Sequence, residues 1–200
     1  MNFTGTLDEL HALTEIFIDK CYKPEKIPNT IIDMGANIGL ATIWLKLNYP
    51  NTKIHAYEPN PEIFNVLKSN ISNLNNVYLY NLAISDTDNE KIEFNISKRS
   101  FSSSKFPIPN SNKIYVSATT IDNAINIVNE KVDLIKIDIE GAEFSAIKIS
   151  NKINEVNEII GEIHPEKANE SSANIINKLE FSHKIKYIGT NKSLFHAIKK

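Results

Sequence analysis

The chain has little of what marks secreted, membrane-embedded or nucleic-acid-binding proteins. Its 200 residues include a single cysteine, Cys21, which excludes an internal disulfide and favours a reducing compartment. No apolar run approaches the ~20 residues that span a bilayer. A net charge of −2 gives no basic surface for nucleic acid or for anionic lipid. The expected partners therefore include no nucleic acid and no stable membrane insertion.

The chain also lacks a targeting signal near its first residues. Asn2, Thr4 and Asp8 stand where a signal peptide would place a basic patch and an apolar run. We therefore expect a cytoplasmic protein.

Two common nucleotide-binding fingerprints are missing as well. The GxGxxG motif of nicotinamide-binding folds would need one glycine at the position of Asn37 and another near Leu40, and this chain has neither. A P-loop would need a GK[ST] sequence after its glycines, and none follows. Both absences count against a cofactor held mainly through its phosphates.

The most informative segment that is present runs from Thr30 to Gly39. A short apolar run ends in Asp33, two glycines (Gly35 and Gly39) follow four residues apart, and an amphipathic stretch continues over 40–48. This pattern predicts a buried parallel strand that turns sharply into a helix whose N-terminus faces a ligand. The glycines let the backbone approach a small molecule closely.

Strand and helix patterns alternate along the chain, which predicts a single α/β domain over 1–200. The fold class expected is a Rossmann-like three-layer sandwich, with helices on both faces of a mostly parallel seven-stranded sheet and a C-terminal antiparallel hairpin. Residues 1–26 are expected to be helical, and 97–118 to form a substrate-side loop or a plain surface loop. The expected strands are 30–34, 53–57, 77–83, 132–138, 158–164, 182–189 and 193–198.

Three acids, Asp33, Glu58 and Asp138, stand at the ends of predicted strands. Ligands of open α/β sheets bind beyond the carboxyl ends of the strands, so these acids should converge on one crevice. Glu58 lies about twenty residues past the glycine turn, the distance at which an acid holds ribose hydroxyls. Such an acidic site suits ribose hydroxyls, an amino group and a sulfonium better than a pyrophosphate. The cofactor predicted is S-adenosyl-L-methionine.

With these motifs in place, the chain resembles the FkbM family of class I S-adenosylmethionine-dependent methyltransferases. The resemblance covers about Tyr22 to Pro165, and the stretch from Lys136 to Glu143 is its most specific part. The matching segments, in order, are Asp33–Gly39, Tyr57–Pro59, Asn81–Asp86, Thr119–Asp122, Lys136–Glu143 and Glu162–His164.

The resemblance implies roles for individual cofactor-binding residues. The methionine and ribose portion would be wrapped by Asp33, Gly35, Asn37 and Gly39, with Glu58 on the ribose hydroxyls. Asn81, Leu82 and Ala83 would flank the adenine, where many relatives place an acid. Here that acid is either replaced by Asn81 or displaced to Asp86. Asp138 would close the site near the methionine end and face the substrate.

The resemblance also implies O-methylation of a hydroxyl on a sugar, a glycan precursor or a secondary metabolite. Methyl transfer to a hydroxyl needs a positioned base, and Glu140, Glu143 and His164 are the candidates, at the same rim as Asp138. The residues expected to be catalytic are Asp138, Glu140 and His164. His164 could instead cap the helix before Pro165 or pair with a carboxylate. A divalent cation held by these acids is a competing interpretation, and no metal is the expectation.

Two other functions stay open on the sequence alone. One is a catalytically silent S-adenosylmethionine-binding partner protein, and the other is a methyltransferase acting on nucleic acid. The partner expected from the leading interpretation is a small-molecule or carbohydrate hydroxyl acceptor. Lys136, within an apolar strand, is expected either to pair with one of the rim acids Asp138, Glu140 and Glu143 or to extend toward solvent.

Overall fold

The centre of the molecule is a seven-stranded sheet in the order β3-β2-β1-β7-β8-β10-β9. The computed structural model describes residues 7–96, 112–189 and 193–200. The first five strands in this order run parallel, and β10 pairs antiparallel with both β8 and β9. The expected fold class is confirmed. The strands are β1 (Thr30–Met34), β2 (Lys53–Tyr57), β3 (Val77–Tyr80), β7 (Leu134–Ile137), β8 (Glu158–Glu162), β9 (His183–Tyr187) and β10 (Leu194–Lys199).

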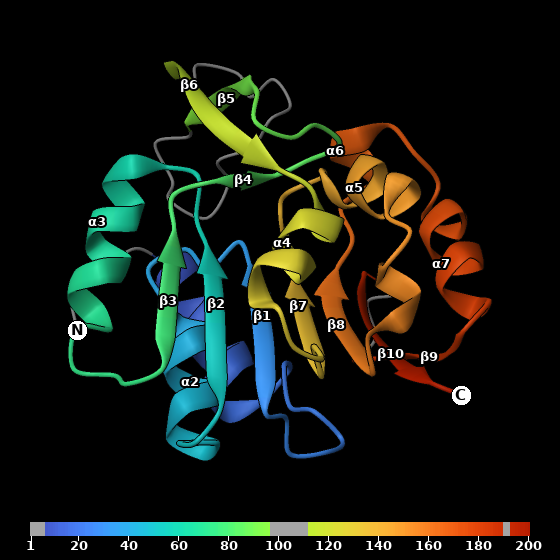
Figure 1. Ribbon diagram of the computed structural model, residues 1–200, viewed down its shortest axis with the longest axis horizontal. Coiled ribbons are helices and arrows are strands. Elements are labelled where there is room, and N and C mark those ends of the chain that lie inside the picture. Colours follow the sequence, from blue (N-terminus) through green and yellow to red (C-terminus); the bar gives the residue numbers. More distant parts are fainter. Residues whose placement is uncertain (1–6, 97–111, 190–192) are drawn as a thin grey trace.

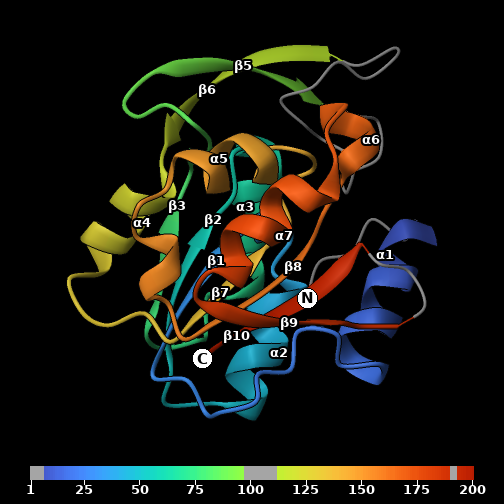
Figure 2. The same ribbon diagram turned by 90° about the vertical axis from the view of Figure 1, so that its right-hand side faces the viewer.

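Helices cover both faces of this sheet (Figures 1 and 2). Neighbouring residues of β1 show why: Ile31 belongs to one buried apolar cluster and Ile32 to the other, because successive strand residues point to opposite faces. The Ile31 cluster includes residues of η1 (Thr14–Ile18, a π-helix), α2 (Leu40–Asn48) and α3 (Pro61–Asn70). The Ile32 cluster includes residues of α4 (Ile121–Val128), α5 (Glu143–Ile149) and α7 (Ser172–Glu180). Helix α1 (Leu7–Leu13) precedes η1.

The last helical region differs from the single helix over 166–179 that periodicity predicts. It is split into α6 (Pro165–Ala168) and α7, because Asn169 adopts a left-handed conformation with φ 51°. The Ser171 side chain then caps α7 by accepting a hydrogen bond from the Ala173 N–H. Asparagine tolerates this conformation better than most residues, which is why it can end a helix here.

A second, three-stranded sheet in the order β4-β6-β5 stands beyond the carboxyl ends of the parallel strands (Figure 1). Its strands are β4 (Ala83–Ile84), β5 (Lys91–Ile96) and β6 (Asn112–Thr119). The strand expected over 77–83 therefore ends early, and its last residue belongs to this second sheet. Of the loop expected over 97–118, residues 112–118 lie in β6, and 97–111 fall outside the described residues.

The order of the main sheet creates a topological switch point between β1 and β7. From β1 the chain proceeds outward through β2 and β3, and it returns to the other side of β1 with β7 and β8. The turn after β1 and the segment after β7 meet here, where the Asp138 N–H donates to the Met34 carbonyl at 3.1 Å. Open α/β sheets bind ligands at such a point. Within the described ranges, no helix is long and apolar enough to cross a membrane.

Candidate cofactor and active site

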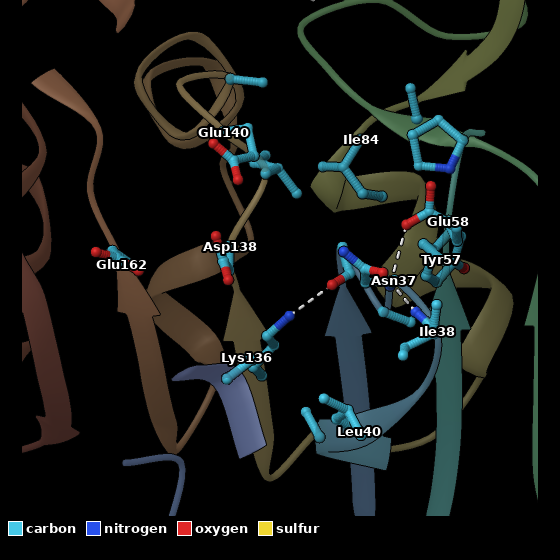
Figure 3. Close-up of a pocket in the computed structure, with 18 of the residues that line it drawn as sticks. Asn37, Ile38, Leu40, Tyr57, Glu58, Ile84, Lys136, Asp138, Glu140 and Glu162 are labelled. Atoms are coloured by element: carbon cyan, nitrogen blue, oxygen red, sulfur yellow. Dashed lines mark hydrogen bonds between the residues drawn. The ribbon is translucent and has the colours of Figure 1, made fainter. Parts of the chain in front are cut away.

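A cavity of about 350 Å³ lies at the switch point, within the size range of small-molecule sites. Its walls come from the turns after β1, β2 and β7, from β4 and β5, and from the N-terminal helical segment. Figure 3 shows the cavity with Tyr57, Glu58 and Ile84 at one end and Asp138, Glu140 and Glu162 at the other. It therefore has a long axis with different chemistry at its two ends.

The glycine turn after β1 forms one wall. Gly35 has φ 79°, and its N–H and that of Ala36 both donate to the Tyr57 carbonyl, at 3.0 and 2.9 Å. A Cβ on Gly35 would lie 1.9 Å from the carbonyl oxygen of Asp138, so only glycine fits. Gly39 has φ 97° and lies outside the cavity lining, where a Cβ would be 2.8 Å from the Leu67 side chain. Gly39 thus lets α2 pack closely against α3.

Replacing Gly35 with alanine should lower the free energy of unfolding by about 2 kcal/mol or more, because the methyl group meets rigid backbone. Gly189→Ala is the matched control, since Gly189 also has a positive φ (73°) but has nothing within 4 Å of its Cβ position. The control should lose only the cost of a left-handed alanine, about 1 kcal/mol. Equal losses in chemical denaturation would contradict the clash at Gly35.

Glu58 is buried and joins two loops at one end of the cavity. Its Oε2 accepts the Asn37 N–H at 3.0 Å, drawn dashed in Figure 3, and its Oε1 accepts the Asn60 N–H at 2.9 Å. Burial raises the pKa of Glu58 to about 7, although these two hydrogen bonds act in the opposite direction. Each carboxylate oxygen has a second lone pair, so the group can still accept hydroxyl donors from the cavity.

Asp33 lies beneath the cavity and does not line it. Its carboxylate is fully buried, accepts the Thr42 hydroxyl at 2.7 Å and forms an ion pair with Lys136 at 3.2 Å. The Lys136 ammonium also donates to the carbonyls of Gly35 at 2.7 Å and Met34 at 3.3 Å. Burial by itself would lower the pKa of Lys136, but the charges of Asp33 and Asp138 raise it overall. Lys136 thus pairs with Asp33 beneath the cavity and not with one of the rim acids that the sequence suggested, and it fixes the glycine turn.

Asp138 lines the opposite end of the cavity. The Tyr22 hydroxyl donates to its Oδ2 at 3.2 Å, and the Lys136 ammonium lies 5.4 Å from the centre of the Tyr22 ring. Burial, followed by the charge of Asp138, raises the pKa of Tyr22 well above its usual value, so the phenol keeps the proton it donates.

His164 lies behind this end, outside the lining, among three carboxylates. Its Nδ1 is 3.1 Å from Glu143 Oε1, and its Nε2 is 3.7 Å from Glu140 Oε2 and 4.0 Å from Asp138 Oδ1. Burial by itself would lower the pKa of His164, but the hydrogen bond with Glu143 and the charge of Asp138 raise it to about 9. His164 is therefore protonated at neutral pH, and in this state it cannot accept a proton.

Glu143 and Glu140 are held by further contacts. The buried Glu143 carboxylate accepts the N–H groups of Ile139 at 2.9 Å and Gly141 at 2.8 Å, and Lys167 is paired with Glu140. Ligand atoms of Asp138, Glu143 and His164 lie within 4.8 Å of one another, a spacing compatible with a metal ion. Glu143 already accepts two backbone N–H groups and contacts His164, so hydrogen bonds also hold this cluster together.

The adenine-side residues divide into two sets. Leu82 and Ala83 line the cavity, whereas the Asn81 amide donates to the carbonyls of Glu58 at 2.8 Å and Pro59 at 3.0 Å. Asn81 thus positions the loop that carries Glu58. Asp86, the alternative acid, accepts the Ser85 hydroxyl at 2.8 Å and lies outside the cavity lining.

Several lining residues were not among the sequence candidates. Glu15 comes from the π-helical turn, Phe94 from β5 and Tyr57 from β2. Glu162, at the end of β8, carries the same strand-end signal that identified the other acids. Burial and the charge of Asp138 raise the pKa values of both Glu15 and Glu162.

This sheet order, with its antiparallel last strand and its acidic cavity at the switch point, defines a Rossmann-like methyltransferase fold. Solved methyltransferases share it at low sequence identity. Methyltransferase FkbM from Methylobacillus flagellatus KT has a TM-score of 0.58 at 13% identity, over 93% of this chain and 47% of that chain. Precorrin-6y C5,15-methyltransferase from Geobacter metallireducens has a TM-score of 0.53 at 13% identity, over 100% and 94% of the two chains.

The sequence narrows this class to a family. The profile of the methyltransferase FkbM domain matches residues 33–188, and the chain belongs to that family. Methyltransferase sdnD of Sordaria araneosa is 28% identical over 171 residues, 67% of this chain and 66% of the relative. The 31-O-demethyl-FK506 methyltransferase FkbM of Streptomyces tacrolimicus is 37% identical over 60 residues, 28% of this chain and 23% of the relative. These matches span less than two thirds of either relative.

Proposed function

We propose that this protein transfers a methyl group from S-adenosyl-L-methionine to a hydroxyl group of a small metabolite or carbohydrate. The observation that carries the proposal is the cavity at the switch point, with buried Glu58 at one end and Asp138 at the other. Family membership supports the reaction class. The name of the Streptomyces relative, a 31-O-demethyl-FK506 methyltransferase, supports a metabolite hydroxyl as acceptor. A sugar or glycan precursor is the other acceptor that we propose.

The donor set of the cavity fits this cofactor. Glu58 would hold the ribose hydroxyls, and Gly35 and Asn37 would face the sugar and the methionine chain. Leu82 and Ala83 would pack against the base. Asp138 would offset the positive charge at the methionine end. Asp33, Gly39 and Asn81 would act indirectly, because their contacts fix the loops that carry the lining residues.

The residues near Asp138 would prepare the acceptor for methyl transfer. When bound, S-adenosyl-L-methionine supplies an electrophilic methyl group on a sulfonium. The protein must align the acceptor hydroxyl with that methyl and take up its proton. Asp138 and Glu140 line the cavity and are the carboxylates that we assign to the proton. Protonated His164 would orient both through its charge, and Glu143 would hold the His164 ring.

Replacing His164 with alanine should lower kcat by about 100-fold, because Asp138 and Glu140 would lose the charge that orients them and a small misplacement of a reacting group costs about that much. The cofactor Kd should change less than threefold, because His164 lies outside the cavity lining. His183→Ala is a poor control, because His183 is itself buried. His11→Ala instead changes a histidine that lines the cavity from α1, so it shows the effect of altering the cavity wall. Wild-type kcat in the His164 variant would remove His164 from the mechanism.

Calorimetric titration with S-adenosylhomocysteine and a radiolabelled methyl-transfer assay together test the proposal. Binding plus transfer to a hydroxyl acceptor is the expected result. Binding without transfer to any sugar or metabolite in a hydroxyl acceptor panel would favour a silent binding partner. Binding to RNA or DNA that weakens steeply with salt would favour a nucleic-acid substrate.

A further inference from the structure

Tyr22 is a cavity-lining residue to which the proposed mechanism gives no role. It lies in the segment between η1 and β1, and only 6% of its surface is exposed. Backbone hydrogen bonds hold the chain on either side of it. The Cys21 N–H donates to the Glu15 carbonyl at 3.0 Å, and the Lys23 N–H donates to the Lys20 carbonyl at 2.9 Å. The Tyr22 side chain therefore reaches the cavity wall from a fixed backbone.

The hydroxyl of Tyr22 contacts one of the two carboxylates that we assign to proton transfer. It donates to Asp138 Oδ2 at 3.2 Å, whereas Asp138 Oδ1 lies 4.0 Å from His164 Nε2. The Asp138 backbone is fixed as well, because its N–H donates to the Met34 carbonyl at 3.1 Å. The carboxylate is thus held from two sides, and each of its oxygens has a second lone pair that can face an acceptor hydroxyl.

The ring of Tyr22 is held in its turn by the charge beneath the cavity. The Lys136 ammonium lies 5.4 Å from the ring centre, close enough for attraction between a cation and an aromatic face. Lys136 is itself anchored by Asp33 and by the Gly35 carbonyl. Burial, followed by the charge of Asp138, raises the pKa of Tyr22 well above its usual value. The phenol therefore remains a hydrogen-bond donor and does not exchange a proton with the acceptor.

We propose that Tyr22 is a positioning residue, whose hydroxyl holds the Asp138 carboxylate in the orientation that takes up the proton of the acceptor hydroxyl. This inference rests on the proposed function. A reacting group misplaced by about 1 Å can cost about 100-fold in rate, so a directional contact on Asp138 matters. His164 acts on the same carboxylate through its charge, and Tyr22 adds the direction.

Several charged groups surround Asp138 and stay in place when the Tyr22 hydroxyl is removed. The Cys21 thiol is also near, but its pKa is raised to about 12, chiefly by burial, so it stays neutral. A change in the titration of Asp138 on loss of the hydroxyl would therefore report the lost hydrogen bond. The charged groups are Glu15, Lys136, Glu140, Glu143, Glu162, His164 and Lys167.

The test is Tyr22→Phe, which removes one oxygen atom and keeps the ring beside Lys136. In the radiolabelled assay, with the acceptor that the hydroxyl panel identifies, kcat should fall about tenfold, the scale of one lost hydrogen bond to a carboxylate. The Kd for S-adenosylhomocysteine should change less than threefold, because the charge of Asp138 remains. A donor to a carboxylate favours its ionised form. In the ligand-free variant, the pH midpoint of the Asp138 carboxyl carbon, followed by ¹³C NMR, should therefore move up by as much as about one pH unit.

Tyr80→Phe is the matched control. It removes a hydroxyl that also has a partner, His55 Nδ1 at 3.0 Å, but Tyr80 lies outside the cavity lining. Both variants should lower the midpoint of chemical denaturation, because each loses one hydrogen bond, whereas Tyr80→Phe should leave kcat and the Asp138 titration unchanged.

Three results would count against the positioning role of Tyr22. Wild-type kcat in Tyr22→Phe, or equal losses of kcat in both variants, would overturn it. A loss of kcat without any change in the Asp138 titration would show a merely structural effect and would overturn it too. No methyl transfer by the wild-type protein to any acceptor in the panel would overturn the proposed function as well.

Discussion

Replacing Glu58 with glutamine is expected to weaken S-adenosylhomocysteine binding by about 100-fold or more. The carboxylate accepts the N–H groups of both Asn37 and Asn60, and glutamine offers only one acceptor oxygen to these two donors. The variant therefore loses one loop anchor and also the charge that would receive the ribose hydroxyls. Hydrogen bonds to a charged group contribute about 1.5–3 kcal/mol each, so two such losses account for this effect. Calorimetric titration measures it directly.

The same residue should make cofactor binding depend on pH. The pKa of Glu58 is raised to about 7 by burial in the ligand-free protein, so the carboxyl is protonated below that pH. Ribose hydroxyls would stabilise the carboxylate and lower its pKa in the complex. Affinity should then be constant above about pH 7 and fall by up to about tenfold per pH unit below it.

Glu62→Gln is the matched control for both measurements. Glu62 is an exposed acid in the first turn of α3, four residues from Glu58 and outside the cavity lining. It should leave both the Kd and its pH dependence unchanged. A Glu58→Gln protein that binds as tightly as wild type at pH 8 would contradict the role of Glu58.

Asp33→Ala is expected to lower the free energy of unfolding by about 3–5 kcal/mol. The substitution leaves the Lys136 ammonium, which is only 3% exposed, without its carboxylate partner. Removing one partner of a buried ion pair has this effect because the remaining charge stays desolvated. Chemical denaturation of the ligand-free protein provides the measurement.

Two further variants separate the ion pair from a general effect of mutation. The double variant Asp33→Asn with Lys136→Met should be more stable than Asp33→Ala, because it removes both charges. Glu93→Gln, which breaks the exposed pair with Lys113 at 2.8 Å, should cost less than about 1 kcal/mol. Equal losses for Asp33→Ala and Glu93→Gln would show that the buried pair contributes nothing special.

The sequence was sufficient for the main sheet because hydrophobic patterning and strand-end acids are local signals. Apolar strands separated by amphipathic helices predicted the parallel sheet, and the two consecutive strands expected over 182–189 and 193–198 predicted the C-terminal hairpin. The same pattern did not predict that β4, β5 and β6 form a separate sheet. That arrangement depends on pairing between Lys91–Ile96 and Asn112–Thr119, and no local rule sets their partner.

The sequence predicted which residues line the cavity where they directly follow a strand. Glu58 and Asp138 line the cavity for this reason, although their chemical roles stay predictions. Asp33 has the same sequence signal but does not line the cavity. Its carboxylate accepts the hydroxyl of Thr42 in α2 and forms an ion pair with Lys136 of β7. Asp33 lies inside β1, next to its last residue, whereas Glu58 and Asp138 each follow the last residue of their strands, and the sequence pattern did not separate these two cases.

Residues that reach the cavity from other elements left no signal. Glu15 comes from a π-helical turn, and Tyr57 reads as an ordinary buried strand residue. Their positions follow from packing, which a single sequence does not specify. The sequence also did not predict that His164 is protonated. That state results from the packing of His164, which follows β8, against two carboxylates that follow β7 and one at the start of α5.

A crystal structure of the protein with S-adenosylhomocysteine tests the central claim most directly. We expect the ribose hydroxyls within hydrogen-bonding distance of the Glu58 carboxylate, and the homocysteine chain running toward Asp138. A ligand bound elsewhere on the protein, or one whose ribose lies away from Glu58, would contradict the account.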